Sequence, residues 1–307
     1  MALTNFPNGV SSFGFPLVGA GPVITTGSVF FVSSVTGVNS TGRGTDPSRP
    51  FASIDYAVGF CTASKGDIIF VMPGHTETVT AAGGLDLDVA GITIYGIGHG
   101  SMRPTVNFTT ATTADMDVDA ANITIHNILF TGGIDALVAP IDINAADCRI
   151  VNCEWRDVTG QPVDTILTDA NASRLLLDGW RHDGDTAAGT NSAVAIVGGD
   201  RITIRNCWFD GNFAVGVIDI RTTATTDLEV NNCYARTRNA ADIFLVDTIT
   251  ASTGMIGPNI YLRLQDNAAN ITEAITGATW VLFDNIYVVN LAGEKAMLIN
   301  TTASTDA

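Results

Sequence analysis

The segment Ile202-Thr-Ile-Arg-Asn206-Cys207-Trp-Phe209 decides the fold, because its pattern returns at nearly constant intervals along the chain. Apolar side chains at 202 and 204 alternate with polar ones, which predicts a strand with one buried face. Asn206 adopts a left-handed backbone more readily than most residues, so we expect a corner there. Cys207 and Phe209 alternate again after the corner. The segment therefore predicts two short strands that point into one interior.

Four other segments align with this one without gaps. They begin at Ile123, Cys148, Leu175 and Leu228, so the five starting positions differ by 25, 27, 27 and 26 residues. An earlier copy begins at Ile92, 31 residues before Ile123. A further strand precedes several copies, as at Ile141-Asp-Ile143 and Ile218-Asp-Ile220. Short strands in a coil of about 25 residues predict a parallel β-solenoid, whereas a leucine-rich repeat needs a Leu consensus and a propeller needs a longer period.

The composition favours an all-β protein and limits its partners. Only five of the 31 acidic residues are Glu and only two of the 15 basic residues are Lys, so strong helix formers are scarce. A net charge of -16 opposes binding to nucleic acid. The sequence has no apolar run of membrane-spanning length, and its first 16 residues lack a secretory signal. We therefore expect folding in a cytoplasm, with no nucleic-acid partner and no membrane insertion.

The position after each corner is predicted to face the interior. This core column consists of Ile128, Cys153, Trp180, Cys207 and Cys233. Five cysteines are an odd number and show no CxxC spacing, which disfavours a disulfide framework and a zinc ribbon. We expect reduced, buried thiols. As an alternative, Cys207 and Cys233 would lie on adjacent coils about 4.8 Å apart and could form a disulfide.

The corner asparagines resemble the ladder of pectate-lyase-like right-handed parallel β-helices, in which stacked amides bond from coil to coil. They are Asn127, Asn152, Asn206 and Asn232. The stretch from Gly44 to Gly74, which contains Phe51 and Tyr56-Ala57, is similar to the N-terminal cap of such proteins. The resemblance implies an all-β, right-handed parallel β-helix (solenoid) with a short N-terminal cap helix, which would cover the open end of the solenoid.

The whole chain also resembles β-helical proteins encoded among bacteriophage virion genes. That resemblance implies a virion component, and such proteins are commonly homotrimers. We divide the chain into an N-terminal attachment arm (1–27), an N-terminal strand and cap helix (28–65), a parallel β-helix (66–250) and C-terminal capping or closing strands (251–307). Residues 1–27 contain no charged side chain and cannot form a core, so they are either an arm that docks on another subunit or a floppy leader. We favour the arm, whose apolar residues are Phe6, Phe13, Phe15, Leu17 and Val18.

Pectate-lyase-like solenoids include lyases and glycoside hydrolases, so acidic clusters are candidate sites. Hydrolysis needs two carboxylates, and a lyase needs calcium and a base. The best pair is Asp183 and Asp185 beside His182, although an Asp-rich turn explains it as well. A second cluster alternates with apolar residues and could bind calcium or form a solvated face. It consists of Asp115, Asp117 and Asp119.

Other motifs give little support to catalysis. Gly98-His99-Gly100 is a weak match to a polygalacturonase motif, because the accompanying paired-aspartate and Arg-x-Lys elements are missing. His99 and His182 are assigned to the column of Phe130 and Trp155, two residues beyond the core column. Scattered histidines and the lack of a phosphate loop or nucleophile elbow lead us to assign no catalytic residue, metal site or cofactor.

These observations lead to one expected function and two alternatives. We expect a bacteriophage virion structural protein made in the host cytoplasm, most simply a capsid decoration or head-spike protein without catalysis. Its partners would be itself, as a homotrimer, and capsid or other virion proteins. The first alternative is a tail-associated spike that binds or cleaves a host surface polysaccharide. A secreted bacterial polysaccharide lyase is disfavoured by the absent signal peptide and the shortage of basic residues.

Overall fold

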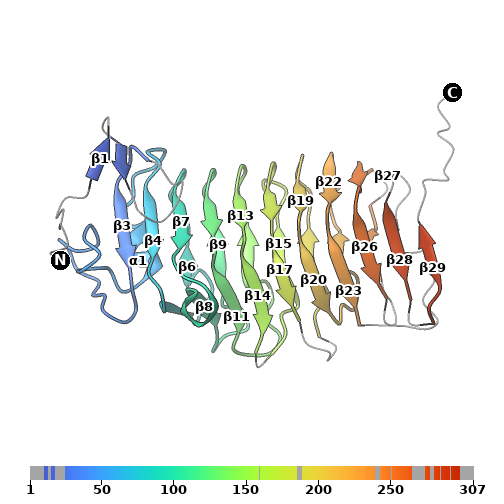
Figure 1. Cartoon of the computed structure of the whole chain (residues 1–307), viewed down its shortest axis with the longest axis horizontal. Coiled ribbons are helices and arrows are strands. Elements are labelled where there is room, and N and C mark those ends of the chain that lie inside the picture. Colours follow the sequence, from blue (N-terminus) through green and yellow to red (C-terminus); the bar gives the residue numbers. More distant parts are fainter. Residues whose placement is uncertain are drawn as a thin grey trace, which may run out of the picture.

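The chain folds into an all-β parallel solenoid in which most coils add one strand to each of three sheets (Figure 1). The computed structural model describes residues 10–12, 15–17, 25–158, 160–184, 189–238, 243–249, 251–264, 274–276, 280–283, 285–290 and 292–297. Equivalent residues of the repeat pair in parallel register, as Ile125 does with Ile150 and Ile150 with Leu177. The predicted parallel solenoid is confirmed.

Sheets I and II meet at the corner that the repeat predicts. Sheet I contains β3 (Val29–Val32), β4 (Ile68–Val71), β7 (Thr93–Gly96), β10 (Thr124–His126), β13 (Arg149–Val151), β16 (Leu176–Asp178), β19 (Thr203–Arg205), β22 (Leu228–Asn231), β25 (Gly254–Ile256) and β27 (Trp280–Leu282). Sheet II contains β5 (Thr76–Val79), β8 (Thr105–Phe108), β11 (Leu129–Gly132), β14 (Glu154–Asp157), β17 (Arg181–Asp183), β20 (Trp208–Gly211), β23 (Tyr234–Thr237), β26 (Ile260–Arg263), β28 (Ile286–Val289) and β29 (Lys295–Met297).

Sheet III closes each coil. It contains β6 (Leu85–Asp86), β9 (Met116–Val118), β12 (Ile141–Ile143), β15 (Asp164–Thr168), β18 (Ser192–Ile196), β21 (Ile218–Ile220) and β24 (Leu245–Asp247). In the described part of the chain, only two pairings of named strands are antiparallel. One joins β28 to β29 and the other joins β1 (Val10–Ser12) to β2 (Phe15–Leu17).

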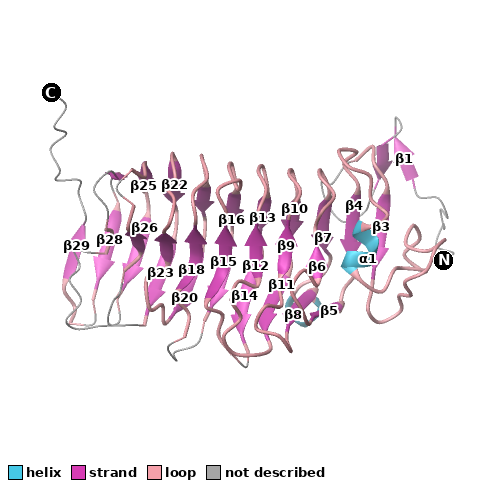
Figure 2. Cartoon of the chain, turned by 180° about the vertical axis from the view of Figure 1, so that it is seen from behind, coloured by secondary structure: helices cyan, strands magenta, loops and turns pink. Residues whose placement is uncertain are grey.

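Helical structure is scarce. Helix α1 (Ile54–Val58) begins after Ser53, whose hydroxyl accepts a hydrogen bond from the Tyr56 amide, and it lies close to β3, β4 and β6 (Figure 2). A 3₁₀ turn, η1, spans Gly100–Met102. A strand of sheet I, β3, precedes α1 in the chain, and the role of this segment as a cap stays a prediction. Among the described residues, no helix is long and apolar enough to span a membrane.

One core runs along the solenoid because alternate residues of each strand point inward. On β23 and β7 the burial alternates at every residue, as expected for strands with one solvent-facing side. Large aromatic rings stack from coil to coil within this core. The centroid of Phe108 lies 6.3 Å from that of Phe130 and 6.2 Å from that of Trp155.

Two expectations about the ends of the repeat are wrong. His99 does not share the column of Phe130, because Val106 pairs with Phe130 while His99 is exposed at the start of η1. The loop between β7 and β8 explains the longer spacing of this copy. Nor does the rhythm end near residue 250, since Tyr261 pairs in parallel with Tyr234 and with Tyr287. A closing role for residues 251–307 stays a prediction.

Candidate functional site

The corner residues hold the coils together through axial hydrogen bonds. Asn127, Asn152, Asn206 and Asn232 have φ angles between 50° and 57°, in the left-handed region. The Asn127 amide donates to the carbonyls of Gly96 and Gly98, both at 2.9 Å. The Asn206 amide donates to Asp178 at 2.8 Å. These bonds reach one coil back, yet none joins two of the four predicted asparagines.

Amide-to-amide bonding occurs instead at the C-terminal end of the same corner. Asn259 donates to Asn232 at 2.8 Å, and Asn285 donates to Asn259 at 3.4 Å. Gly179 interrupts the column between Asn152 and Asn206, so the nearest axial partner of Asn206 is a carboxylate rather than an amide. Along this corner the left-handed backbone geometry repeats from coil to coil, whereas the axial partner of the asparagine amide varies between a carbonyl, a carboxylate and another amide.

The core column offers no accessible nucleophile. Ile128, Cys153, Trp180, Cys207 and Cys233 are all buried, and the cysteines are unpaired thiols. Burial raises the pKa of Cys153 to about 11, and burial likewise raises the pKa of Cys207. Reactive cysteines need the opposite shift, because the thiolate is the nucleophile.

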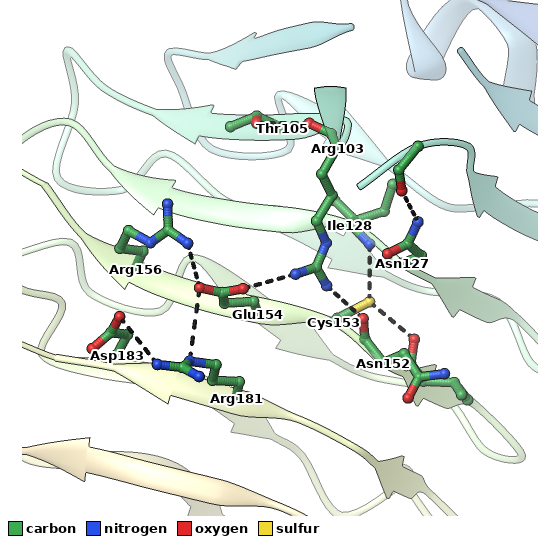
Figure 3. A network of polar contacts seen from close by, with 12 residues as sticks. Arg103, Thr105, Asn127, Ile128, Asn152, Cys153, Glu154, Arg156, Arg181 and Asp183 are labelled. Carbon is green, nitrogen blue, oxygen red and sulfur yellow. Dashed lines mark hydrogen bonds and ion pairs between the residues drawn. The ribbon is translucent and has the colours of Figure 1, made fainter. Parts of the chain in front are cut away.

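Sheet II carries an ionic network on its outer face around Glu154 (Figure 3). This carboxylate is nearly buried and meets Arg103 at 2.8 Å, Arg156 at 2.6 Å and Arg181 at 4.0 Å. Arg103 stands two coils before Glu154 and also donates to the Asn152 carbonyl. Because three guanidinium groups surround this one carboxylate, the group ties neighbouring coils together and leaves Glu154 no free oxygen to transfer a proton.

Two further buried aspartates are compensated in the same way. Asp210 on β20 meets Arg236 at 2.8 Å and Arg238 at 2.7 Å. On sheet III, Asp164 accepts a hydrogen bond from the Ser192 hydroxyl at 2.6 Å and pairs with Arg221, which stands two coils further on. Burial raises the pKa of Asp210, an effect that the adjacent Arg236 only partly offsets.

Among the described residues, a row of aspartates on sheet III forms no such ion pair. Asp86, Asp117 and Asp142 lie in register on β6, β9 and β12, one on each successive coil. Burial, followed by the repulsion of neighbouring aspartates, raises the pKa of Asp117 and of Asp142 to about 6. A carboxyl group with such a pKa is partly protonated near neutral pH and can serve as a general acid. Sequence analysis found Asp115, Asp117 and Asp119 but missed the partners on other coils.

The acidic pair predicted beside His182 is not assembled in the described structure. Asp185 lies outside the described residues, and Asp183 is half-exposed, 3.7 Å from Arg181. The ring of His182 is fully buried beside Phe213, and neither of its nitrogens has a hydrogen-bond partner in the described part of the chain. Burial lowers the pKa of His182 to about 3, so this side chain is neutral and belongs to the core.

An outward row of aromatic side chains on sheet II was also missed. Trp208 and Tyr234 stack with centroids 6.0 Å apart, and Tyr261 and Tyr287 stack at 5.6 Å. The Arg181 guanidinium lies over the Trp208 ring, 4.4 Å from its centroid. The signal was present in the sequence, because each of these rings stands two residues after a corner asparagine.

The structure describes only part of the predicted N-terminal arm. Phe6, Phe13 and Val18 of the proposed arm lie outside the described residues, whereas Phe15 and Leu17 belong to the backbone of β2. Among the described residues, no three His, Cys, Asp or Glu side chains gather closely enough to hold a metal ion.

Comparisons with known proteins support the fold. No protein-family model matches the sequence, and no curated protein matches it. A solved structure described as a rhamnogalacturonan lyase superposes with a TM-score of 0.52 and 14% sequence identity, over 90% of this chain and 86% of that chain. At this identity the similarity shows a shared β-solenoid architecture.

Proposed function

We propose that the protein is a non-catalytic structural component of a bacteriophage virion, a capsid decoration or head-spike protein. The observation that supports this role most is the set of ion pairs that arginines form between coils. Seven arginines of the described chain reach a carboxylate on another coil: Arg103, Arg174, Arg181, Arg205, Arg221, Arg236 and Arg238. Ion pairs between coils suit a rigid, rod-shaped structural protein.

These ion pairs between coils differ in strength according to how deeply they are buried. Exposed pairs such as Arg174 with Asp147 contribute little, because solvent and salt screen them. Buried carboxylates such as Glu154 and Asp164 depend on their partners much more, because removing one partner leaves a buried charge unpaired. Nine of the 15 basic residues thus form ion pairs within the described part of the fold, which leaves the smaller part of them to hold an acidic polymer along its length.

The particle role is tested by locating the protein. Cryo-electron microscopy of purified particles that carry this gene product should show a rod-shaped density at the capsid surface that fits the solenoid. The proposed homotrimer predicts threefold density at that position. Particles that lack the protein, or that carry it only at the tail tip, would contradict a capsid role.

A second candidate, cleavage of a host surface polysaccharide by a tail-associated spike, is favoured by the aspartate row. Asp117 and Asp142 occupy adjacent strands and have raised pKa values, a combination that suits the general acid and its partner in glycoside hydrolysis. The structural neighbour is described as a rhamnogalacturonan lyase. The charged groups acting on the row are aspartates, so an acid is better supported than the base of a lyase.

This candidate is tested by measuring new reducing ends after incubation with a panel of bacterial surface polysaccharides. Activity should fall by at least about 100-fold in Asp142→Asn, because a general acid contributes on that order. Asp183→Asn is a matched control, since Asp183 is half-exposed on another sheet. A wild-type protein without activity on the panel, or equal loss in both variants, would eliminate the hydrolase.

A further inference from the structure

Two side chains at the N-terminal end of sheet I are buried although they point outward. Alternate residues of β4 point to opposite faces, so Ile69 and Val71 belong to the solenoid core whereas Ile68 and Phe70 face away from it. In a single copy of the chain, Ile68 and Phe70 are nevertheless only 1% exposed. Another part of the same chain therefore covers the outer face of β4.

Neighbouring strands alone do not bury an outward ring on this sheet. The Phe70 ring lies between those of Phe31 and Tyr95, and both centroid distances are 5.8 Å. Tyr95 lies in the same way between Phe70 and His126, yet Tyr95 is partly exposed. Flanking rings thus leave an outward ring in contact with solvent, and Phe70 needs a further cover from above the sheet.

The segment that precedes β3 starts beside this face. The hydroxyl of Thr25 donates a hydrogen bond to the carbonyl of Gly66, two residues before Ile68, so residue 24 lies close to the start of β4. An extended chain spans about 3.3 Å per residue and adjacent strands lie about 4.8 Å apart, so a few residues suffice to cross from β3 to β7. Strands β1 and β2 lie at the same end of the solenoid as β3 and β4 (Figure 1).

The composition of this segment matches the apolar face. Residues 1–24 contain no charged side chain and supply several large apolar ones, namely Phe6, Phe13, Phe15, Leu17 and Val18. Burial of such a segment against Ile68 and Phe70 removes apolar surface from water on both sides and desolvates no charged side chain. The loop that follows β3 is less suitable, because it carries three charged residues between positions 40 and 50.

We propose that in an unassembled copy residues 1–24 fold back over the outer face of sheet I of the same copy and cover Ile68 and Phe70. A second copy is not needed, because both side chains are buried in a single chain. Docking of the N-terminal arm on another subunit would first require its release from this face. The contact needs neither a particle nor catalysis, so it stands or falls separately from both functions proposed above.

The test measures how fast a thiol at position 68 reacts with a maleimide. Ile68→Cys is compared in the full-length chain and after deletion of residues 2–24, both with Cys61→Ser, because Cys61 is the one native cysteine that is not buried. Deletion should accelerate labelling at least about 100-fold, because the thiol then no longer depends on local opening to meet the reagent. Thr124→Cys is the matched control in the same outward column, and its rate should change by less than about twofold.

A point variant tests the contact without removing the segment. Phe15→Asp in the full-length chain should accelerate labelling at position 68 at least about tenfold, because a carboxylate resists burial against an apolar face. Asn5→Asp adds the same charge at a polar position and should keep the rate within about twofold. Circular dichroism verifies that each variant is folded.

Three results would overturn the proposal. The first is rapid labelling of Ile68→Cys in the full-length protein, and the second is an equal rate with and without residues 2–24 or an equal effect of Asn5→Asp and Phe15→Asp. The third is faster labelling of the full-length protein on dilution by about 100-fold, because protection within one copy does not depend on protein concentration. The cover would then come from another copy.

Discussion

Replacing His182 by phenylalanine should flatten the dependence of stability on pH. The imidazole is fully buried and its two nitrogens have no partner among the described residues, so the folded protein holds it neutral. Its pKa falls from 6.5 to about 3 on folding because burial disfavours the charged ring. The imidazole therefore binds a proton below about pH 6.5 in the unfolded chain, but only below about pH 3 in the folded protein.

The magnitude follows from this difference in proton binding. Stability falls as the pH drops through the window between the two pKa values, with a limiting slope of about 1.4 kcal/mol per pH unit. Between pH 7 and pH 5 the wild type should lose about 2 kcal/mol through His182 alone. The phenylalanine variant lacks this contribution, and it also removes two buried polar atoms without partners, so it should be more stable at pH 7.

Equilibrium denaturation in urea, followed by tryptophan fluorescence at pH 7, 6 and 5, measures the effect. The change in unfolding free energy between pH 7 and pH 5 is compared among wild type, His182→Phe and His182→Leu, where leucine guards against overpacking near Gly184. His99→Gln is the control, because it removes an exposed histidine. An equal pH-dependent loss in wild type and both His182 variants would refute a buried, neutral imidazole.

Four other outcomes are expected. Asn206→Val should destabilise the protein by about 1–3 kcal/mol, because valine tolerates φ of 56° poorly and loses the bond to Asp178; an unchanged melting temperature would contradict this. Native labelling of Cys153, Cys207 and Cys233 by a thiol reagent should be slow and become complete on unfolding, whereas rapid native labelling would place the column outside. Asp142→Asn should be more stable than wild type at pH 8, because burial and neighbouring aspartates destabilise the charged form of Asp142 in the folded protein. This difference in unfolding free energy should shrink as the pH falls below about 6, where Asp142 becomes protonated. A difference that is undiminished at pH 4 would exclude the charge of Asp142 as its cause. Deleting residues 2–27 should leave the solenoid folded and abolish trimer formation or incorporation into particles, and normal assembly of the truncated protein would reduce the arm to a leader.

The solenoid could be predicted from the sequence because each coil carries its own signals. Alternating apolar residues define a strand, and one residue tolerant of positive φ defines the corner, so five copies locate two of the three sheets. Where a loop changes length, the local pattern loses its register. The loop between β7 and β8 changes the register, so His99 does not lie in its assigned column. The apolar alternation before Asn259 and Asn285 is weak, and the two corners at these residues were therefore not predicted.

The candidate sites were harder to predict because they form between coils. Asp117 meets Asp86 and Asp142 only after the intervening loops fix which residues are neighbours. Arg103 reaches Glu154 across 51 residues, a separation that no local pattern reveals. The row of Trp208 and the tyrosines was visible as a motif, but its exposure depended on knowing which face of the strand looks outward.

Strand β29 gives the C-terminal end of sheet II a polarity opposite to that of the coils before it. Strand β29 runs antiparallel to β28, whereas a further coil of the solenoid would add a strand parallel to β28. The exposed Lys295 also places a charge on this edge, as natural edge strands often do. Copies of this protein should therefore resist joining end to end into fibres through sheet II, even at high protein concentration.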